Sequence, residues 1–213
     1  MAFLGQVFQI LSRLALTGKA RLAQRCNPPA LAAICLALVL LGAAAVPVQA
    51  NPAAPALEEY EAKAAFVFNF AKFIHWPETR ALDEDLCIGV VGDNPFGTHI
   101  LQLQGTRVAG RSIVVAFPAT VADLLSCDLL FISASESPRL EALLGALVQA
   151  PVLTVGDMEG FAARGGMIEM YLRDNRIRFR INLEAARAAG LDISSRLLQL
   201  ASNAEELMRE QRR

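Results

Sequence analysis

Polar side chains that could line a binding site follow several short apolar runs of this sequence. The loops after these runs hold five candidate ligand-binding residues: Asp93, Asn94, Ser133, Glu136 and Asp157. Loops at the carboxyl ends of parallel strands are where an open α/β sheet binds ligands. The same residue types also cap the helices that follow such loops. The set therefore has two interpretations, a polar ligand pocket and ordinary helix capping, of which capping is the more common.

The patterns of common enzyme and metal sites do not occur in the sequence. Neither phosphate-loop pattern, GxGxxG or GxxxxGK[ST], is present, and no serine lies in a GxSxG elbow. The two histidines, His75 and His99, form neither an HExxH spacing nor a Cys/His cluster. We therefore expect a protein that is not an enzyme and that holds no metal ion and no cofactor.

Three arginines, Arg176, Arg178 and Arg180, alternate with apolar residues near the end of the chain. In a strand this period of two places the three guanidinium groups on one face and the apolar side chains on the other. A solvated sheet face explains the pattern. The sharper alternative is a docking surface for an acidic partner, because the planar guanidinium suits carboxylates.

The elements that must position these residues alternate between strand and helix. Compact apolar runs predict strands at 86–91, 111–117, 128–132 and 151–155. Between them, apolar residues at helical spacing predict helices at 96–103, 119–125 and 138–149. Short apolar strands that alternate with helices are typical of a parallel sheet covered on both faces.

The two ends of this region follow different patterns. The pattern at residues 57–74 predicts a helix that Pro77 ends, with Glu59 and Lys63 spaced to form an ion pair. The second half of this helix is rich in aromatic residues, which belong either to the core or to a protein-binding patch. Strands 166–172 and 176–181, joined by residues 173–175, predict an antiparallel hairpin. A helix 183–189, capped by Asn182 and Gly190, and a last helix 194–208 follow. The fold class is therefore α/β, a three-layer domain with a mostly parallel central sheet, an antiparallel hairpin at one edge and helices on both faces.

The first fifty residues have the order of a signal peptide. They contain four basic and no acidic residues, then an apolar run, 30–46, and then Pro47-Val48-Gln49-Ala50. We expect cleavage after Ala50, a linker at 51–57 and a domain at 58–209; an uncleaved membrane anchor is the alternative. Removal of four of the 20 basic residues changes the net charge from −1 to −5, which does not suggest a nucleic-acid partner.

Cleavage leaves two of the four cysteines, Cys87 and Cys127. A pair of cysteines in an oxidising compartment predicts a disulfide, with two buried free thiols as the alternative. The bond would close a loop of about 40 residues and stabilise the fold by about 4 kcal/mol in the chain-entropy model.

Several segments together resemble the YfiR family of periplasmic proteins, in the family's order across residues 58–201. The first is KAAFVFNFAKFIHWP at 63–77, and the others include CIGVVGDNPFG at 87–97, CDLLFIS at 127–133, PVLTVGD at 151–157 and RFRIN at 178–182. The resemblance implies a small periplasmic α/β protein whose Cys87–Cys127 pair fits the family's structural disulfide. A further C-terminal cysteine pair found in some relatives has no counterpart here.

The resemblance implies a regulatory role. The protein would bind and repress the periplasmic sensor part of an inner-membrane signalling protein, a YfiN-like diguanylate cyclase or a histidine kinase, and so control cyclic di-GMP and biofilm formation. It also implies a homodimer and an outer-membrane YfiB-like lipoprotein as a further partner. The alternative function is a periplasmic small-molecule-binding module that feeds a membrane sensor kinase.

Overall fold

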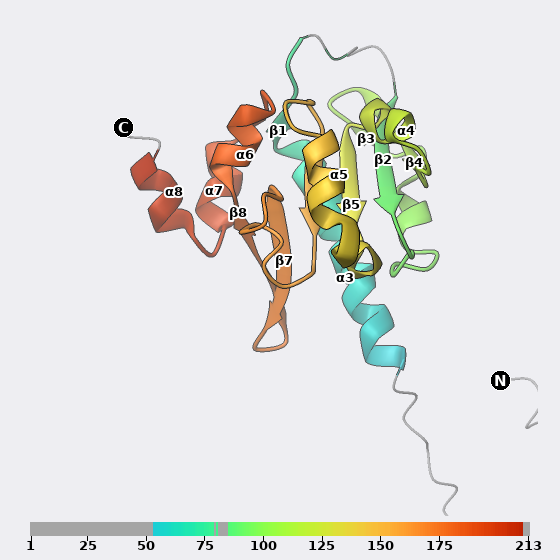
Figure 1. Ribbon diagram of the computed structural model, residues 1–213. Coiled ribbons are helices and arrows are strands. Elements are labelled where there is room, and N and C mark those ends of the chain that lie inside the picture. Colours follow the sequence, from blue (N-terminus) through green and yellow to red (C-terminus); the bar gives the residue numbers. More distant parts are fainter. Residues whose placement is uncertain (1–52, 79, 81–84, 211–213) are drawn as a thin grey trace, which may run out of the picture. The chain divides into compact units, whose positions relative to one another are not determined.

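The computed structural model describes residues 53–78, 80 and 85–210 (Figure 1). The predicted signal peptide, 1–50, and the first two residues of the predicted linker lie outside the described residues. None of the helices in the described residues has the length and apolar character that a membrane span requires.

Seven strands of the described residues form one sheet in the order β3-β4-β2-β5-β6-β7-β8. Their bounds are β2 Leu86–Val91, β3 Arg107–Val108, β4 Arg111–Ala116, β5 Leu129–Ile132, β6 Leu153–Gly156, β7 Ile168–Arg173 and β8 Arg176–Ile181. The inner neighbours from β4 to β7 are parallel, whereas β3 and β8 pair antiparallel at the two edges. The predicted fold class is therefore confirmed, with β3 as an addition that the sequence did not indicate.

Helices cover both faces of this sheet, with α5 in front of it and α3 behind it in Figure 1. On one face α3 (Ala53–Lys72) packs with α6 (Leu183–Ala188) and the C-terminal helices, and on the other lie α4 (Val121–Ser126) and α5 (Leu140–Ala146). Alternate residues of β5 belong to opposite layers: Phe131 lies in the α3 layer and Leu130 in the α5 layer, both fully buried. A central strand buried on both faces has no polar side, which explains its continuous apolar sequence.

The antiparallel hairpin of β7 and β8 has a two-residue turn rather than the predicted three-residue connection. Asp174 and Asn175 both have positive φ, 52° and 54°, and Arg173 pairs directly with Arg176. Two consecutive left-handed residues are the signature of a type I′ turn, whose twist matches that of the flanking strands.

The first helix and the segment after β2 differ from their predicted bounds. α3 begins at Ala53, so residues 53–57 of the predicted linker are helical, and it ends at Lys72. After it, β1 (Ile74–His75) pairs antiparallel with β9 (Asp192–Ile193) in a separate two-stranded sheet. The predicted helix 96–103 is wrong: turns lead into a 3-10 helix, η1 (Ile100–Leu103).

Two further helices are shorter than predicted. The segment predicted as one helix from Pro138 begins instead as a 3-10 helix, η2 (Ala134–Arg139), and only then becomes α5. The predicted last helix is two helices, α7 (Ser195–Leu200) and α8 (Ala204–Glu210). The chain is extended at Ala201, because Ser202 N–H donates to the carbonyl of Phe179 and the Asn203 side chain bonds both main-chain groups of Ile181.

Candidate functional site

The loops after β2 and β5 contact each other at the carboxyl end of the sheet. The Asp93 N–H donates to Ser135 Oγ at 2.9 Å, and a Cβ placed on Gly92, whose φ is +84°, would lie 2.7 Å from Glu136 Cγ. Gly92 therefore allows a close approach that another residue would prevent. Asn94 holds its own turn, because its side-chain oxygen accepts from Phe96 N–H at 2.9 Å. Asp93 and Asn94 are exposed.

The two predicted site residues after β5 are buried. Ser133 precedes η2, but its side chain makes no capping hydrogen bond. Glu136 is 6% exposed and pairs with Arg139, whose Nε lies 2.6 Å from the carboxylate. This hydrogen bond raises the pKa of the Arg139 guanidinium. Ser133 is therefore not a side-chain cap, and a ligand-binding role of Ser133 and Glu136 stays a prediction.

Asp157, at the end of β6, belongs to a buried polar cluster with α3. Its carboxylate accepts from Lys63 Nζ at 2.6 Å and from Tyr60 Oη at 2.9 Å, and Lys63 also pairs with Glu59 at 2.5 Å. Burial and the neighbouring carboxylate of Asp157 raise the pKa of Tyr60 well above its usual value, so the phenol stays a proton donor. α3 thus supplies an ammonium and a phenol group to the carboxylate at the end of β6.

This Tyr60–Lys63–Asp157 cluster is only partly visible in the sequence. The spacing of Glu59 and Lys63 predicts their ion pair, which is present. The contact with Asp157 joins residues 94 positions apart, and no local pattern reports it.

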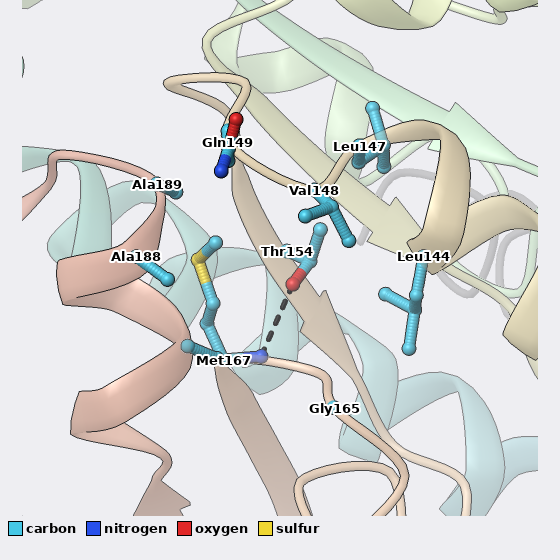
Figure 2. A pocket seen from close by; sticks show the side chains of 10 residues that line it. Leu144, Leu147, Val148, Gln149, Thr154, Gly165, Met167, Ala188 and Ala189 are labelled. Atoms are coloured by element: carbon cyan, nitrogen blue, oxygen red, sulfur yellow. Dashed lines mark hydrogen bonds between the residues drawn. The ribbon is translucent and has the colours of Figure 1, made fainter.

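An apolar pocket lies between α5 and α6, away from the strand-end loops (Figure 2). Its volume is about 90 Å³, and Leu144, Val148 and Met167 are among its lining residues. The one side-chain hydroxyl drawn there, Thr154 Oγ1, accepts from Met167 N–H at 3.1 Å. Sites for small molecules usually span about 300–1,000 Å³, so this pocket has room for little more than one small side chain.

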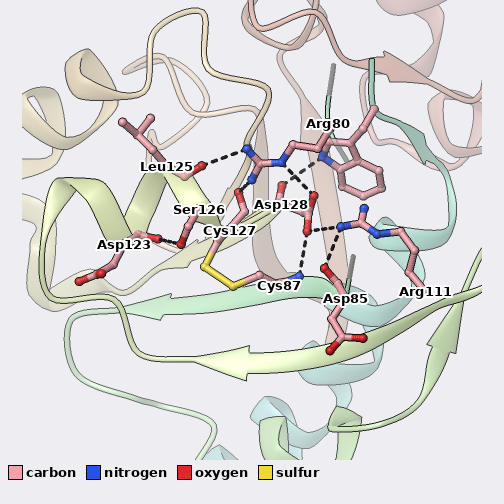
Figure 3. A network of polar contacts seen from close by, with 10 residues as sticks. Arg80, Asp85, Cys87, Arg111, Asp123, Leu125, Ser126, Cys127 and Asp128 are labelled. Carbon is pink, nitrogen blue, oxygen red and sulfur yellow. Dashed lines mark hydrogen bonds and ion pairs between the residues drawn. A yellow bond between two sulfur atoms is a disulfide. The ribbon is translucent and has the colours of Figure 1, made fainter. Parts of the chain in front are cut away.

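A disulfide joins Cys87 in β2 to Cys127 at the end of α4, as the sequence predicts, with the two Cα atoms 4.6 Å apart. Beside the disulfide, Asp128 is 1% exposed and lies at the centre of a network of hydrogen bonds (Figure 3). Its carboxylate accepts from Cys87 N–H and from Arg111 at 2.8 Å each, and from Arg80 at 3.1 Å.

Arg80 extends this Asp128 network to the end of α4. Its guanidinium also donates to the carbonyls of Leu125 and Cys127. On the other side, Trp76 Nε1 donates to the Asp128 carbonyl at 3.2 Å. No motif in the sequence predicts this network, whose one local signal is a lone acidic residue, Asp128, at the start of an apolar strand. These hydrogen bonds join Trp76 and Arg80 to the start of β5 and the end of α4, so the network has a structural role.

The arginines of β8 lie on one face of the hairpin, with all three exposed. On the opposite face Phe179 is 6% exposed and contacts Phe70 of α3, with ring centroids 5.1 Å apart. Arg180 lies over the Tyr171 ring at 4.9 Å and 3.9 Å from the carboxylate of Glu169. The alternation expected from the sequence is therefore present, and the role of Arg176, Arg178 and Arg180 in binding a partner stays a prediction.

Across the part of the chain that the structure describes, no group of three or more His, Cys, Asp or Glu side chains is placed to hold a metal ion. The sequence model of the protein family described as YfiR/HmsC-like matches residues 60–202. This span runs from the partly buried Tyr60 of α3 to the break between α7 and α8. A search of curated proteins gives no match.

Proposed function

We propose, because the chain belongs to the YfiR/HmsC-like family, that it is a periplasmic regulator of the cyclic di-GMP system. In this proposal it binds the periplasmic sensor part of an inner-membrane diguanylate cyclase and holds the cyclase inactive. Release of the cyclase would raise cyclic di-GMP and favour biofilm formation.

The observation that carries this proposal is the extent of the family match. Residues 60–202 include the whole sheet, both cysteines of the disulfide and the arginines of β8. Membership of the family supports a regulator of the cyclic di-GMP system. That this regulator acts directly on the cyclase is our own proposal.

The packing of the strand ends favours a protein partner over a small-molecule ligand. Asp157 is neutralised by Lys63 and hydrogen-bonded to Tyr60, and Glu136 is paired with Arg139. A ligand that binds Asp157 would have to displace its buried ion pair with Lys63, which is costly. The exposed surfaces of the domain are the better candidates for recognition.

The partner can be tested by crosslinking a tagged copy of the full chain in living cells and identifying the captured proteins. We expect an inner-membrane cyclase, a second copy of the chain and an outer-membrane lipoprotein. A matched control lacks residues 1–50 and should capture none of them. Failure of the full chain to capture any membrane sensor, under oxidising and reducing conditions alike, would overturn the proposed function.

The cyclase as target has its own measurement, cyclic di-GMP in a deletion strain. We expect the level to rise on deletion and to return when the gene is restored. An unchanged level would remove the cyclase and leave a histidine kinase as the sensor to examine.

Export can be tested by the intact mass of the protein purified from the periplasm. We expect the mass of a chain that begins at Asn51 and that gains two hydrogens on reduction, because cleavage would leave Cys87 and Cys127 as its cysteines. A mass that retains residues 1–50 would contradict cleavage.

A further inference from the structure

The β7–β8 hairpin presents a concentrated positive charge on one face, here called the cationic face. It consists of Arg173, Arg176, Arg178 and Arg180 with Tyr171, which share one face because the register pairs Arg173 with Arg176 and Tyr171 with Arg178. The Arg173 side chain is 74% exposed and that of Arg180 is 48% exposed. The chain that carries this face has a net charge of −1, or −5 without the predicted signal peptide. The cationic face is therefore a local feature and not a consequence of a basic protein.

The cationic face is held rigidly from behind. Phe179 contacts Phe66 and Phe70 of α3, with ring centroids 6.2 Å and 5.1 Å apart. Met170 and Ile181, on the same apolar side, are 0% and 2% exposed. Because this side is buried, β8 cannot turn its arginines away from the surface. Alternate side chains along a strand are separated by about 6.6–6.8 Å, so the guanidinium groups have a defined spacing.

The charges of this face are unequally compensated within the chain. Arg180 has Glu169 at 3.9 Å and lines a hollow of about 340 Å³ together with Glu184 and Glu206. Arg173 has its neighbour Asp174 at 3.9 Å. Within the described residues, by contrast, no carboxylate forms an ion pair with Arg176 or Arg178. These two residues are the ones with charge available to another molecule.

The C-terminal part of the outer edge of β8 is taken by the chain itself. Ser202 N–H donates to the Phe179 carbonyl at 2.8 Å, and Asn203 bonds the N–H and carbonyl of Ile181 at 3.1 Å and 2.9 Å. A partner strand added here would therefore find the Phe179 carbonyl and both main-chain groups of Ile181 already bonded. Recognition by side chains of the cationic face fits the geometry better than extension of the sheet.

We propose that the cationic face docks an extended acidic segment of a partner protein, with carboxylates on alternate residues that meet Arg176 and Arg178. This inference rests on the proposed function, since the partner would be the periplasmic part of the membrane sensor. Arg forms two parallel hydrogen bonds with a carboxylate, and the period of two on β8 matches the same period in an extended segment.

The distribution of apolar residues speaks for a protein segment and against a lipid surface. The exposed apolar residue of the hairpin, Leu172, is 50% exposed but pairs with Ile177 on the opposite face. A membrane-binding face would combine basic and apolar side chains.

The test uses the full chain exported to the periplasm, as wild type and as the Arg176→Glu/Arg178→Glu variant. The control, Arg107→Glu/Arg187→Glu, makes the same change of net charge at two exposed positions outside the hairpin. The probe is a short fluorescent peptide of alternating Glu and Thr, compared with its Gln-for-Glu form by anisotropy. We expect the wild type and the control to bind the acidic peptide in a salt-dependent manner. The Kd of the hairpin variant should rise about tenfold or more.

Several results would overturn the inference. The first is that the hairpin variant and the control bind the acidic peptide with equal affinity. The second is that the wild type binds the Gln form of the peptide as tightly as the Glu form. Binding of the wild type to phosphatidylglycerol vesicles, without binding to the peptide, would identify a lipid surface instead. If the charge-reversed variant does not fold, Arg176→Gln/Arg178→Gln should show the same loss, because it removes the charge without introducing repulsion.

Crosslinking in cells separates this inference from the proposed function. Capture of a membrane sensor by the wild type but not by the hairpin variant supports both. Equal capture by the wild type and the hairpin variant leaves the function standing and overturns the docking surface. Absence of capture by the wild type contradicts the function itself.

Discussion

Replacing Asp128 with asparagine is expected to lower the free energy of unfolding by about 3–5 kcal/mol, the usual cost of removing one partner from a buried ion pair. The Asp128 side chain is 2% exposed and lies 2.8 Å from Arg111 Nη2, and the Arg111 side chain is only 6% exposed. Asparagine keeps the shape of the side chain but removes its charge. The buried Arg111 guanidinium would then lose its ion pair with Asp128. The main-chain N–H of Cys87, which also donates to this carboxylate, anchors the same site to β2.

Urea unfolding with the disulfide intact measures this loss directly. For a domain of this size the melting temperature should fall by about 6–20 °C, at roughly 2–4 °C per kcal/mol. Asp192→Asn is the control, because that side chain is 83% exposed and its replacement should change stability by less than about 0.5 kcal/mol. In the double variant Asp128→Asn/Arg111→Met the loss should be smaller than the sum of the two single losses.

A loss below about 1 kcal/mol for Asp128→Asn, with an unchanged m value, would refute this reasoning. It would mean that solvent or rearranged side chains replace the carboxylate at little cost. An additive double variant would likewise show that Asp128 and Arg111 act independently, which the 2.8 Å contact does not allow.

Three further predictions concern other parts of the domain. Lys63→Met should destabilise by about 3–5 kcal/mol in urea unfolding, because it leaves the carboxylate of Asp157, 5% exposed, without its cation. Asp123→Asn should lower the melting temperature at neutral pH, because hydrogen bonds in the cap of α4 lower the pKa of Asp123. A carboxylate whose pKa is lowered by folding stabilises the folded state above about pH 4, and this stabilisation is lost as the pH falls. The difference in melting temperature between the variant and the wild type should therefore disappear in acid. Gly156→Ala should cost about 1–3 kcal/mol, because the new Cβ would lie 2.7 Å from the buried ring of Phe161.

Matched variants and contrary outcomes decide these three predictions. Tyr60→Phe removes a hydrogen bond from Asp157 but no charge, so an equal loss in Tyr60→Phe and Lys63→Met would contradict the charge argument. A melting-temperature difference for Asp123→Asn that persists in acid would show that the charge is not its cause. Gly145→Ala is the control for Gly156→Ala: it lies in α5, nothing is within 4 Å of the added Cβ, and it should stabilise the domain slightly. If Gly156→Ala is equally harmless, the contact with the Phe161 ring does not constrain the backbone.

Local patterns were sufficient for the strands and for several of their boundaries. The continuous apolar run before Ser133 predicted a strand buried on both faces, and β5 is fully buried. Alternation predicted the two faces of β8, and Asn182 was recognised as the cap of α6, where its side chain accepts from Ala185 N–H. These features depend on residues a few positions apart, so the period and the capping chemistry are present in the sequence itself.

The bounds of the helices were less accessible to local patterns. Helical spacing runs through residues 194–208, yet the chain breaks at Ala201. The break follows from hydrogen bonds of Ser202 and Asn203 to β8, which lies more than one element away. Helix propensity is worth only tenths of a kcal/mol per residue, whereas unpaired main-chain groups at a buried edge cost more. Tertiary contacts therefore decided where the helix ends.

The sequence by itself determined the fold class, the disulfide pair as a candidate, the family and the cationic face of β8. Only the tertiary structure decided what the acidic residues do. Asp157 pairs with Lys63 across 94 positions, and Asp128 pairs with Arg80 across 48. Asp157, one of the five predicted strand-end residues, is therefore bonded to α3 itself. The physical reason is that a buried charge must find a partner wherever the fold places one, and the identity of that partner is a property of the packed chain rather than of any segment of it.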